Sequence, residues 1–576
     1  MTLFGWNDSG SPKAAKTAAL SGAGAARSVG LWLLILLLVY AAGLTREISA
    51  PWAGMHDWNG AFFSQLARNF LRYPLSVDHG MPMVAMGSAV PPVGERSIYA
   101  THPPGLVWLV AGAFEALGES EAAARMVPIV ASLGSLALLV WMVFRAYGVG
   151  TAILSGLIYS LMPMAVYFGR MVDHEAVCLL CMLAAVAAWC RVADPGVARR
   201  TRLPSVAAWM AAVGVGIWVD WSAVLFAAVF CAYVVFWCLR RRERRGQWRL
   251  VVFMLCFAGA VTVGMVAFVV YAGLDGRWSD LVAIFFSRTT APVEHVRRWS
   301  GVSEGSAWTY LIENLTWPVL VLSVCGAAMA LWGCSSRRRK PTVLPRADGV
   351  DVQHPHPSPQ PKDRVLTYSS AARDGLLVIL ITGVLWVVIF WRQYEVHNYW
   401  LFYLGPAAAV FSAQTLVALW RCLSKVDASL AYACVGVALL LTVGLEHQGT
   451  RVYFGRTSQE LALRIGDWRR VHRMTATGDR VALFHDPRRI EQRGGFRFVN
   501  LVPPQLAYYL DRAIDVETDF ARVAAGRSRW AVFVLSKADA VIHGGALRPL
   551  RLRFAEVPLS REVVFDLRRR LSDLRK

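Results

Sequence analysis

The chain has 576 residues, of which 56% are hydrophobic and 17% charged, and its formal net charge is +21. With a mean hydropathy of +0.42, it is too apolar for a water-soluble protein of this length. Much of the Lys and Arg excess lies in short loops beside apolar runs, where it sets membrane orientation and meets anionic headgroups, so it does not indicate a nucleic-acid partner.

The first apolar run covers residues 29–45 and is preceded by Lys13, Lys16 and Arg27. A cleaved signal peptide has a similar basic start, but its apolar core is shorter and would not be followed by many further runs. We therefore expect a retained first membrane span, preceded by a cytoplasmic tail of residues 1–28.

Ten further apolar runs are candidate spans of the ~30 Å hydrocarbon core of a bilayer, and the short run 206–218 is the weakest of them. They lie at residues 126–144, 151–168, 176–189, 206–218, 222–239, 250–273, 317–333, 375–390, 401–420 and 428–445. The sequence thus predicts a polytopic α-helical membrane domain over residues 29–445 with about eleven spans. Another run, residues 104–117, opens with Pro-Pro and is too short to span, so we expect it to be re-entrant or interfacial.

The positions of the basic clusters predict how the chain is oriented across the membrane. With the N-terminus inside and eleven spans, nearly every short basic cluster falls on the cytoplasmic side, as the positive-inside rule requires. These clusters are Arg145; Arg191, Arg199, Arg200 and Arg202; residues 240–245; residues 337–340; and Arg421 with Lys425. The first long loop, residues 46–125, and the C-terminal region are then extracytoplasmic, in a plasma (inner) membrane.

Two regions differ from the apolar pattern. Residues 335–373 are rich in Pro, His and charge, which predicts a disordered inner loop. Residues 446–576 predict a small extracytoplasmic α/β domain, with an amphipathic helix at 457–473 and short strands at 480–484, 496–499 and 530–535.

The ten cysteines all lie in or at the ends of apolar runs. We therefore expect no structural disulfides and no metal site built from thiolates. No metal ligands are assigned from the sequence, and dependence on a divalent metal stays open.

Polar residues gather in the predicted outer loops. They are His56 and Asp57 in the first loop, His102 before the Pro-Pro pair, Arg125 at the start of the second span, Arg170, Asp173 and Glu175 before the fourth, and His397 with Tyr399 before the tenth. Ionisable residues at span ends indicate a functional site. A carboxylate can accept a proton from a hydroxyl, and arginine can bind a phosphate and stabilise it as a leaving group.

These motifs resemble the GT-C membrane glycosyltransferases, in particular the family of protein O-mannosyltransferases and lipid A aminoarabinose transferases. The resemblance covers roughly residues 31–445. It is carried by the early acid Asp57, the segment from Tyr99 to Pro104, Ala124-Arg125, the Arg170, Asp173 and Glu175 motif, and His397-x-Tyr399 followed by Gly405-Pro406.

The resemblance implies an inverting hexosyl or pentosyl transferase that takes a monosaccharide from a polyprenyl-phosphate donor. The acceptor would be a hydroxyl of a glycan, lipid or protein on the outer face. Asp57 would be the catalytic base, and Arg125 and Arg170 would bind the donor phosphate. His56, His102, Asp173, Glu175, His397 and Tyr399 would contact substrate or support the site. The family often has an Asp-Glu pair where this chain has Asp57-Trp58, so any second acid stays unassigned.

Structural roles compete with each assignment. Asp57 could cap a helix, Arg125 could anchor at the interface, and Asp173 and Glu175 could be solvated charges. His102 could be a structural hydrogen-bonding residue, and His397 with Tyr399 could belong to an interfacial aromatic belt. At the level of function, a transporter or flippase of a lipid-linked sugar is the alternative, although the sequence has no internal repeat of the kind that transporters carry. A membrane scaffold would not explain the acid in the long first loop.

Overall fold

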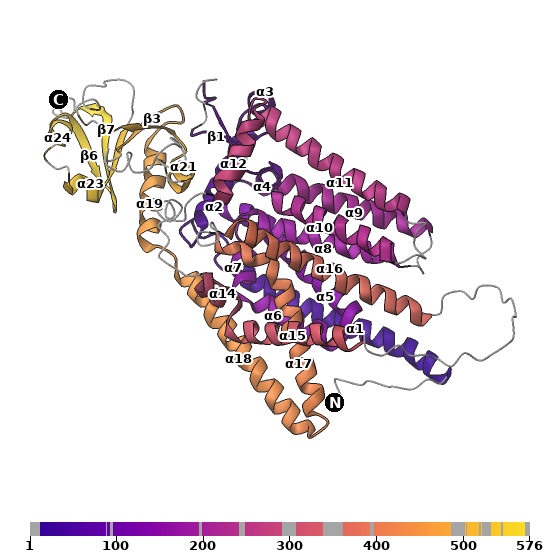
Figure 1. The fold of residues 1–576 in the computed structure, drawn as a ribbon. Coiled ribbons are helices and arrows are strands. Elements are labelled where there is room, and N and C mark those ends of the chain that lie inside the picture. Colours follow the sequence, from indigo (N-terminus) through magenta and orange to yellow (C-terminus); the bar gives the residue numbers. More distant parts are fainter. Residues whose placement is uncertain are drawn as a thin grey trace.

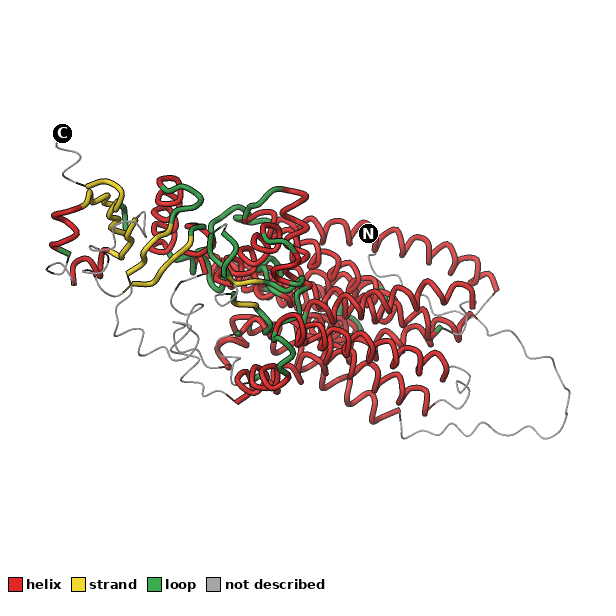
Figure 2. The backbone as a smooth tube through the Cα atoms, turned by 90° about the horizontal axis from the view of Figure 1, so that it is seen from above, coloured by secondary structure: helices red, strands yellow, loops and turns green. Residues whose placement is uncertain are grey.

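The computed structural model describes residues 12–570 apart from 88, 93–95, 195–198, 241–247, 291–306, 338–360, 392–396, 485–501, 503, 518–519, 521–522, 524–531, 543–544 and 546. It consists of a long helical bundle with a small sheet-containing domain at one end (Figures 1 and 2). We call the end of the bundle that carries this domain the domain end.

Each of the eleven predicted runs coincides with a helix. These helices are α1 (Pro12–Leu44), α5 (Glu121–Tyr147), α6 (Val149–Leu161) continued by α7 (Pro163–Phe168), α8 (His174–Ala193), α9 (Arg199–Val219), α10 (Trp221–Arg240), α11 (Trp248–Phe268), α15 (Trp317–Arg337), α16 (Pro361–Ile389), α17 (Gly405–Leu423) and α18 (Ala428–Gly455). Within the described residues, eight helices are long and apolar enough to cross a membrane. A ninth candidate is α15 taken together with α14 (Ala307–Leu315), although the two helices meet at a bend of 91°. Shorter apolar segments occur in α1 and α6.

The inner loop differs in part from its prediction. Helix α15 continues to Arg337, and α16 begins at Pro361, so residues 361–373 form a helix that leads directly into an apolar run. Helix propagation adds one hydrogen bond for each residue fixed, which lets a stable apolar helix extend into polar sequence. Residues 338–360 lie outside the described part of the chain.

Short elements cover the domain end of the bundle (Figure 1). They are α2 (Asp57–Arg72), α3 (Leu75–Asp78), β1 (Met83–Val84), β2 (Ser97–Ile98), α4 (Gly105–Leu117), the π-turn η3 (Val269–Gly273), α12 (Trp278–Thr290), α14 and the 3₁₀ helix η5 (Asn398–Leu404). The short run with Pro-Pro is helix α4, whose 13 residues are too few to span a bilayer. It packs against α2 and α5. Strands β1 and β2 pair antiparallel, with Met83 opposite Ile98.

The C-terminal domain begins with α19 (Gln459–Met474) and contains a five-stranded sheet of order β4-β3-β5-β7-β6. Its strands are β3 (Arg480–Phe484), β4 (Ala513–Glu517), β5 (Val532–Ser536), β6 (Phe554–Pro558) and β7 (Glu562–Arg570), and its short helices are α21 (Pro504–Leu510), α23 (Lys537–Ile542) and α24 (Arg548–Arg553). β3 lies parallel to β4 and β5, whereas β7 is antiparallel to β5 and β6. The helix and the strands predicted near residues 480 and 530 are present, and the strand predicted at 496–499 falls outside the described residues.

The C-terminal domain is docked onto α2 through charged contacts. Arg68 has a side chain only 8% exposed, bonds to Glu119 and donates to the carbonyl of Tyr508 at 2.8 Å. Arg72, which is more exposed, forms two 2.6 Å bonds to Asp511. Because charged hydrogen bonds contribute most when they are shielded from water, Arg68 should hold the domain more firmly than Arg72.

We expect Arg68→Ala to loosen this docking. Loss of shielded hydrogen bonds to a charged group should cost ~1.5–3 kcal/mol, against ~0–1 kcal/mol for the matched, more exposed variant Arg72→Ala. Hydrogen–deuterium exchange of α21 measures the effect, with faster exchange expected in Arg68→Ala. Equal protection of α21 in the two variants would contradict this ranking.

Candidate active site

The predicted base and both predicted phosphate ligands line one pocket at the domain end. The pocket is bounded by residues from the first loop, the turn after α7 and the end of α18. They are Glu47, Ala50, Pro51, Gly54, Asp57, Arg125, Tyr167, Arg170, Met171, Phe454 and Thr457. Thus residues up to about 400 positions apart in sequence meet at a single cavity.

Asp57 is the first residue of α2, and the chain enters the helix through His56, whose φ of 58° is left-handed. The side-chain oxygen Oδ2 of Asp57 accepts a 2.8 Å hydrogen bond from the backbone N–H of Gly54. A Cβ at Gly54 would lie 2.8 Å from the Tyr167 hydroxyl and 2.9 Å from Oδ2 of Asp57, so any larger residue here would displace one of these side chains. The bond to Gly54 precedes the helix, and Asp57 is not its N-cap, so the helix-cap interpretation is wrong. Within the described part of the chain, the Oδ1 atom of Asp57 accepts no hydrogen bond.

Arg125 is fixed in the pocket wall with 1% of its surface exposed. Ser120 caps the start of α5 by accepting from Ala123 N–H, which places Arg125 in the first turns of that helix. Its Nη1 donates to the carbonyls of Ile48 and Ala50 at 2.8 and 2.6 Å, and its Nη2 lies 3.4 Å from Oδ2 of Asp57. This burial and these bonds exclude a role as an exposed interfacial anchor.

Arg170 lies in the turn between α7 and α8 and is also buried. It donates to the backbone carbonyls of Arg46 and Glu47. Burial and, next, the neighbouring Arg125 cation lower the pKa of Arg170 to about 10, so the guanidinium stays charged at neutral pH. Two adjacent guanidiniums that repel one another form a site that an anion would stabilise.

A second set of polar residues forms a buried network beneath α2. Asn59 donates to Oδ2 of Asp173 at 2.5 Å and lies 3.4 Å from the Tyr399 hydroxyl. The Tyr399 hydroxyl is 2.5 Å from Nδ1 of His397. His397 and Tyr399 are 7% and 4% exposed, so they belong to the protein interior and not to an aromatic belt facing headgroups.

His56 joins the same network by a 3.0 Å contact between its Nε2 and the amide oxygen of Asn398. Burial lowers the pKa of His56 to about 4, so this imidazole is neutral at physiological pH. The network therefore orients the start of α2, which carries Asp57. Sequence reasoning assigned no role to Asn59 or Asn398, although Asn59 follows Asp57 by two residues and Asn398 lies between His397 and Tyr399.

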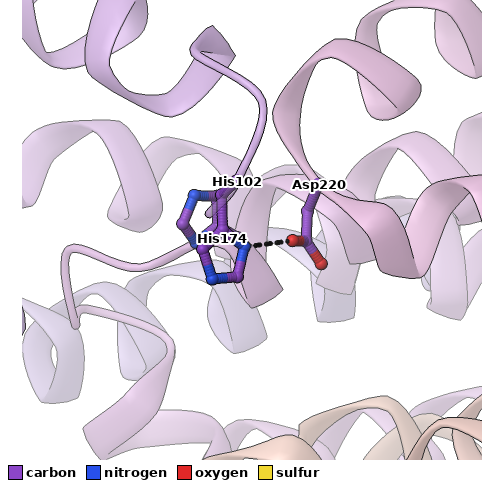
Figure 3. A group of neighbouring side chains, drawn as sticks. All are labelled: His102, His174 and Asp220. Carbon is purple, nitrogen blue, oxygen red and sulfur yellow. Dashed lines mark hydrogen bonds and ion pairs between the residues drawn. The ribbon is translucent and has the colours of Figure 1, made fainter. Parts of the chain in front are cut away.

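A third group consists of His102, His174 and Asp220 (Figure 3). Nδ1 of His102 lies 2.8 Å from Oδ1 of Asp220, and the rings of His102 and His174 stack with centroids 4.5 Å apart. Burial and then the charge of His174 lower the pKa of His102. Asp220, between α9 and α10, was not assigned from the sequence. The sequence feature that could have identified Asp220 is its position as a lone carboxylate between two apolar runs.

Asp173 and Glu175 flank His174 at the start of α8 and are 6% and 5% exposed. They are therefore not solvated loop charges. Asp173 caps α8, and its Oδ1 lies 2.8 Å from Nδ1 of His174. Thus the pocket is lined by three of the nine predicted site residues, Asp57, Arg125 and Arg170. The other six do not line it, and all of them except Glu175 belong to the hydrogen-bonded groups described above.

We compared the sequence and the fold with those of known proteins. Residues 101–270 match the family described as dolichyl-phosphate-mannose-protein mannosyltransferase. No curated protein matches the chain. The structure of ArnT from Cupriavidus metallidurans without ligand aligns with a TM-score of 0.57 at 14% identity, over 94% of this chain and 98% of ArnT. ArnT bound to undecaprenyl phosphate aligns at 0.56 and 15%, over the same shares.

The oligosaccharyltransferase of Archaeoglobus fulgidus also aligns, with a TM-score of 0.54 at 9% identity, over 92% of this chain and 74% of that protein. These alignments include the bundle and extend over nearly the whole chain. The family match begins at Thr101, within the segment that carries His102 and the Pro-Pro pair, and includes Arg125, Arg170 and the start of α8. The chain therefore has the fold of the GT-C membrane glycosyltransferases, and its resemblance to the family of protein O-mannosyltransferases and lipid A aminoarabinose transferases is confirmed.

Proposed function

We propose that this protein transfers a monosaccharide, a hexose or a pentose, from a polyprenyl-phosphate donor to an acceptor hydroxyl, with inversion at the anomeric carbon. The observation that carries the proposal is the meeting of Asp57, Arg125 and Arg170 at one pocket. Such a transfer needs a base for the acceptor and cations for the phosphate leaving group, and this pocket offers both.

The donor phosphate would bind between the two arginines. Two backbone carbonyls hold Arg125 through its Nη1. Its Nη2 lies 3.4 Å from Oδ2 of Asp57. Because the protein fixes the guanidinium before the ligand arrives, little reorganisation would be needed when charge develops on the phosphate. The undecaprenyl phosphate in the ArnT complex supports a donor of this lipid class. The apolar helices would accommodate its tail.

Asp57 would act as the base for the acceptor hydroxyl. Its Oδ2 accepts the hydrogen bond from Gly54 N–H and lies near Arg125. Oδ1 is therefore the atom suited to accept a proton. Direct attack by the acceptor, with the phosphate leaving from the opposite face, gives inversion. An enzyme acting through Asp57 as a nucleophile would instead retain the configuration.

Turnover of a labelled donor tests the proposal. Purified protein in detergent should release polyprenyl phosphate from a polyprenyl-phosphate monosaccharide and place the labelled sugar on an acceptor. Donor that crosses a vesicle membrane unchanged, with no release of polyprenyl phosphate, would favour the transporter alternative. Lipid extracts of the purified protein, analysed by mass spectrometry, should contain polyprenyl phosphate or its sugar conjugate.

We further propose that the domain end faces the extracytoplasmic side of the plasma membrane. A phosphatase reporter that is active only outside the cytoplasm should be active when fused after the C-terminus. The same reporter inserted after Lys425, in the turn between α17 and α18, should be inactive because Lys425 and the nearby Arg421 favour the inner side. The reverse pattern would overturn the orientation.

A further inference from the structure

We propose that His102, His174 and Asp220 bind a divalent transition-metal ion, and that Zn²⁺ suits their ligand set best. The three residues come from the His-Pro-Pro segment, the first turn of α8 and the turn between α9 and α10. One potential ligand atom from each lies within 4.8 Å of the others (Figure 3). The proposal concerns binding of the ion and does not depend on the transferase activity.

The geometry is close to that of a coordinated site. Nδ1 of His102 and Oδ1 of Asp220 are already 2.8 Å apart. Ligand atoms around tetrahedral Zn²⁺ lie about 3.3 Å from one another, as follows from metal–ligand bonds of about 2.0–2.1 Å. Side-chain rotations that close the longest separation by at most about 1.5 Å would complete the site. The His102 side chain is 23% exposed, which provides a route for the ion.

The surroundings orient two of the ligands. Nδ1 of His174 is bonded to Oδ1 of Asp173 at 2.8 Å, which leaves Nε2 as the nitrogen that can coordinate. A carboxylate bonded to the far nitrogen of a histidine is the usual support of a metal-binding imidazole. The second oxygen of Asp220 accepts from the backbone N–H of Ser222 at 3.0 Å, which fixes that carboxylate as well.

Buried negative charge supplies an independent reason for a cation. The carboxylates of Asp173 and Asp220 are each at least nine-tenths buried. Oε2 of Glu175 is buried without a hydrogen-bond partner among the described residues. Among the described residues, Arg288 is an arginine whose charge acts on His102. A divalent ion would offset the remaining carboxylate charge, which is costly to bury uncompensated.

The ligand types select the class of ion. Two imidazoles and one carboxylate suit Zn²⁺ and related transition metals, whereas Mg²⁺ and Ca²⁺ prefer sites made of oxygen atoms. Three protein ligands leave a fourth tetrahedral position for water or for a further group.

The ion would act on the candidate active site by positioning it. Asp173 bonds His174 through one oxygen and Asn59 through the other, and Asn59 lies two residues after Asp57 in the first turn of α2. A bound ion that fixes His174 would therefore fix the start of the helix that carries Asp57. The His102, His174 and Asp220 side chains would be metal ligands, and Asp173 a positioning residue.

Metal content of the full-length protein tests the proposal. Protein prepared without a polyhistidine tag and supplied with Zn²⁺ should carry about one equivalent by mass spectrometry, and Co²⁺ should give the visible bands of a tetrahedral site. His102→Ala, His174→Ala and Asp220→Asn should each lose the ion. Asp173→Asn should keep the ligands but weaken affinity about 10–100-fold, as expected for a group that supports a ligand.

His79→Asn is the matched control, because His79 is an exposed histidine at the same end with a left-handed φ of 53° that asparagine tolerates. It should retain the ion. For the wild type, removal of the ion by a chelator should lower the thermal unfolding midpoint, and Zn²⁺ should restore it. Absence of bound Zn²⁺ and of a Co²⁺ spectrum in well-folded wild-type protein would overturn the proposal, as would full occupancy in all three ligand variants.

Discussion

Asp57→Asn should abolish sugar transfer while leaving donor binding intact. The amide has nearly the size of the carboxylate and can still accept the hydrogen bond from Gly54, but it cannot take a proton at neutral pH. General-base catalysis contributes about 10²–10⁴-fold, so turnover should fall by that factor. Donor affinity and product formation, measured on the same purified variant, separate the two effects.

Asp275→Asn is the control for this variant. Asp275 is a carboxylate with a side chain 91% exposed in the turn after η3, and it does not line the pocket. Its replacement should leave turnover unchanged. Normal transfer by Asp57→Asn would contradict the assignment of Asp57 as the base. Asp173 or Glu175 would then be the next candidate for that role. Loss of both donor binding and folding would point to a structural role for Asp57 instead.

Arg125→Lys and Arg170→Ala should each lower turnover ~100-fold or more, by analogy with the removal of a donor that stabilises a developing oxyanion. Lysine keeps the charge at position 125, but it lacks the planar fork that now contacts two backbone carbonyls and approaches Asp57. The loss should appear in the chemical step and in donor affinity together, because the phosphate is present in both the bound donor and the leaving group. Steady-state kinetics with a labelled donor measure both quantities.

Arg456→Lys serves as the control for the arginine variants. Arg456 lies near the same end, is paired with Glu313 at 2.7 Å and does not line the pocket. It should retain near-normal turnover. If Arg125→Lys and Arg170→Ala behave like Arg456→Lys, the donor phosphate is bound elsewhere.

The spans were predictable because their signal is local. A long uncharged run must be helical in hydrocarbon, where every backbone polar group needs a partner within its own segment. The same reasoning identified residues 104–117 as too short to span, and they form the 13-residue helix α4. In the C-terminal domain, the apolar strands β3 and β5 were predicted, whereas β4, β6 and β7 were not. The sheet order β4-β3-β5-β7-β6 depends on pairings between distant segments that no local pattern encodes.

The candidate site was predictable only in part. Asp57 stood out as an acid in the long first loop, and Arg125 and Arg170 stood out as charges at the ends of apolar runs. The three residues line one pocket. The partners of the predicted histidines were missed because they lie far away in the sequence. Asp220 meets His102 across 118 residues, and Asn398 meets His56 across 342. The backbone carbonyls that hold Arg125 and Arg170 carry no sequence signal at all.

A structure of the protein with polyprenyl phosphate bound would test the central claim most directly. The claim is that Asp57, Arg125 and Arg170 form the active site of a lipid-linked sugar transferase. We expect the phosphate to lie within hydrogen-bond distance of both Arg125 and Arg170, in the pocket that Asp57 lines, with the lipid tail along the apolar helices. A phosphate bound at a different place, with this pocket empty, would contradict the account.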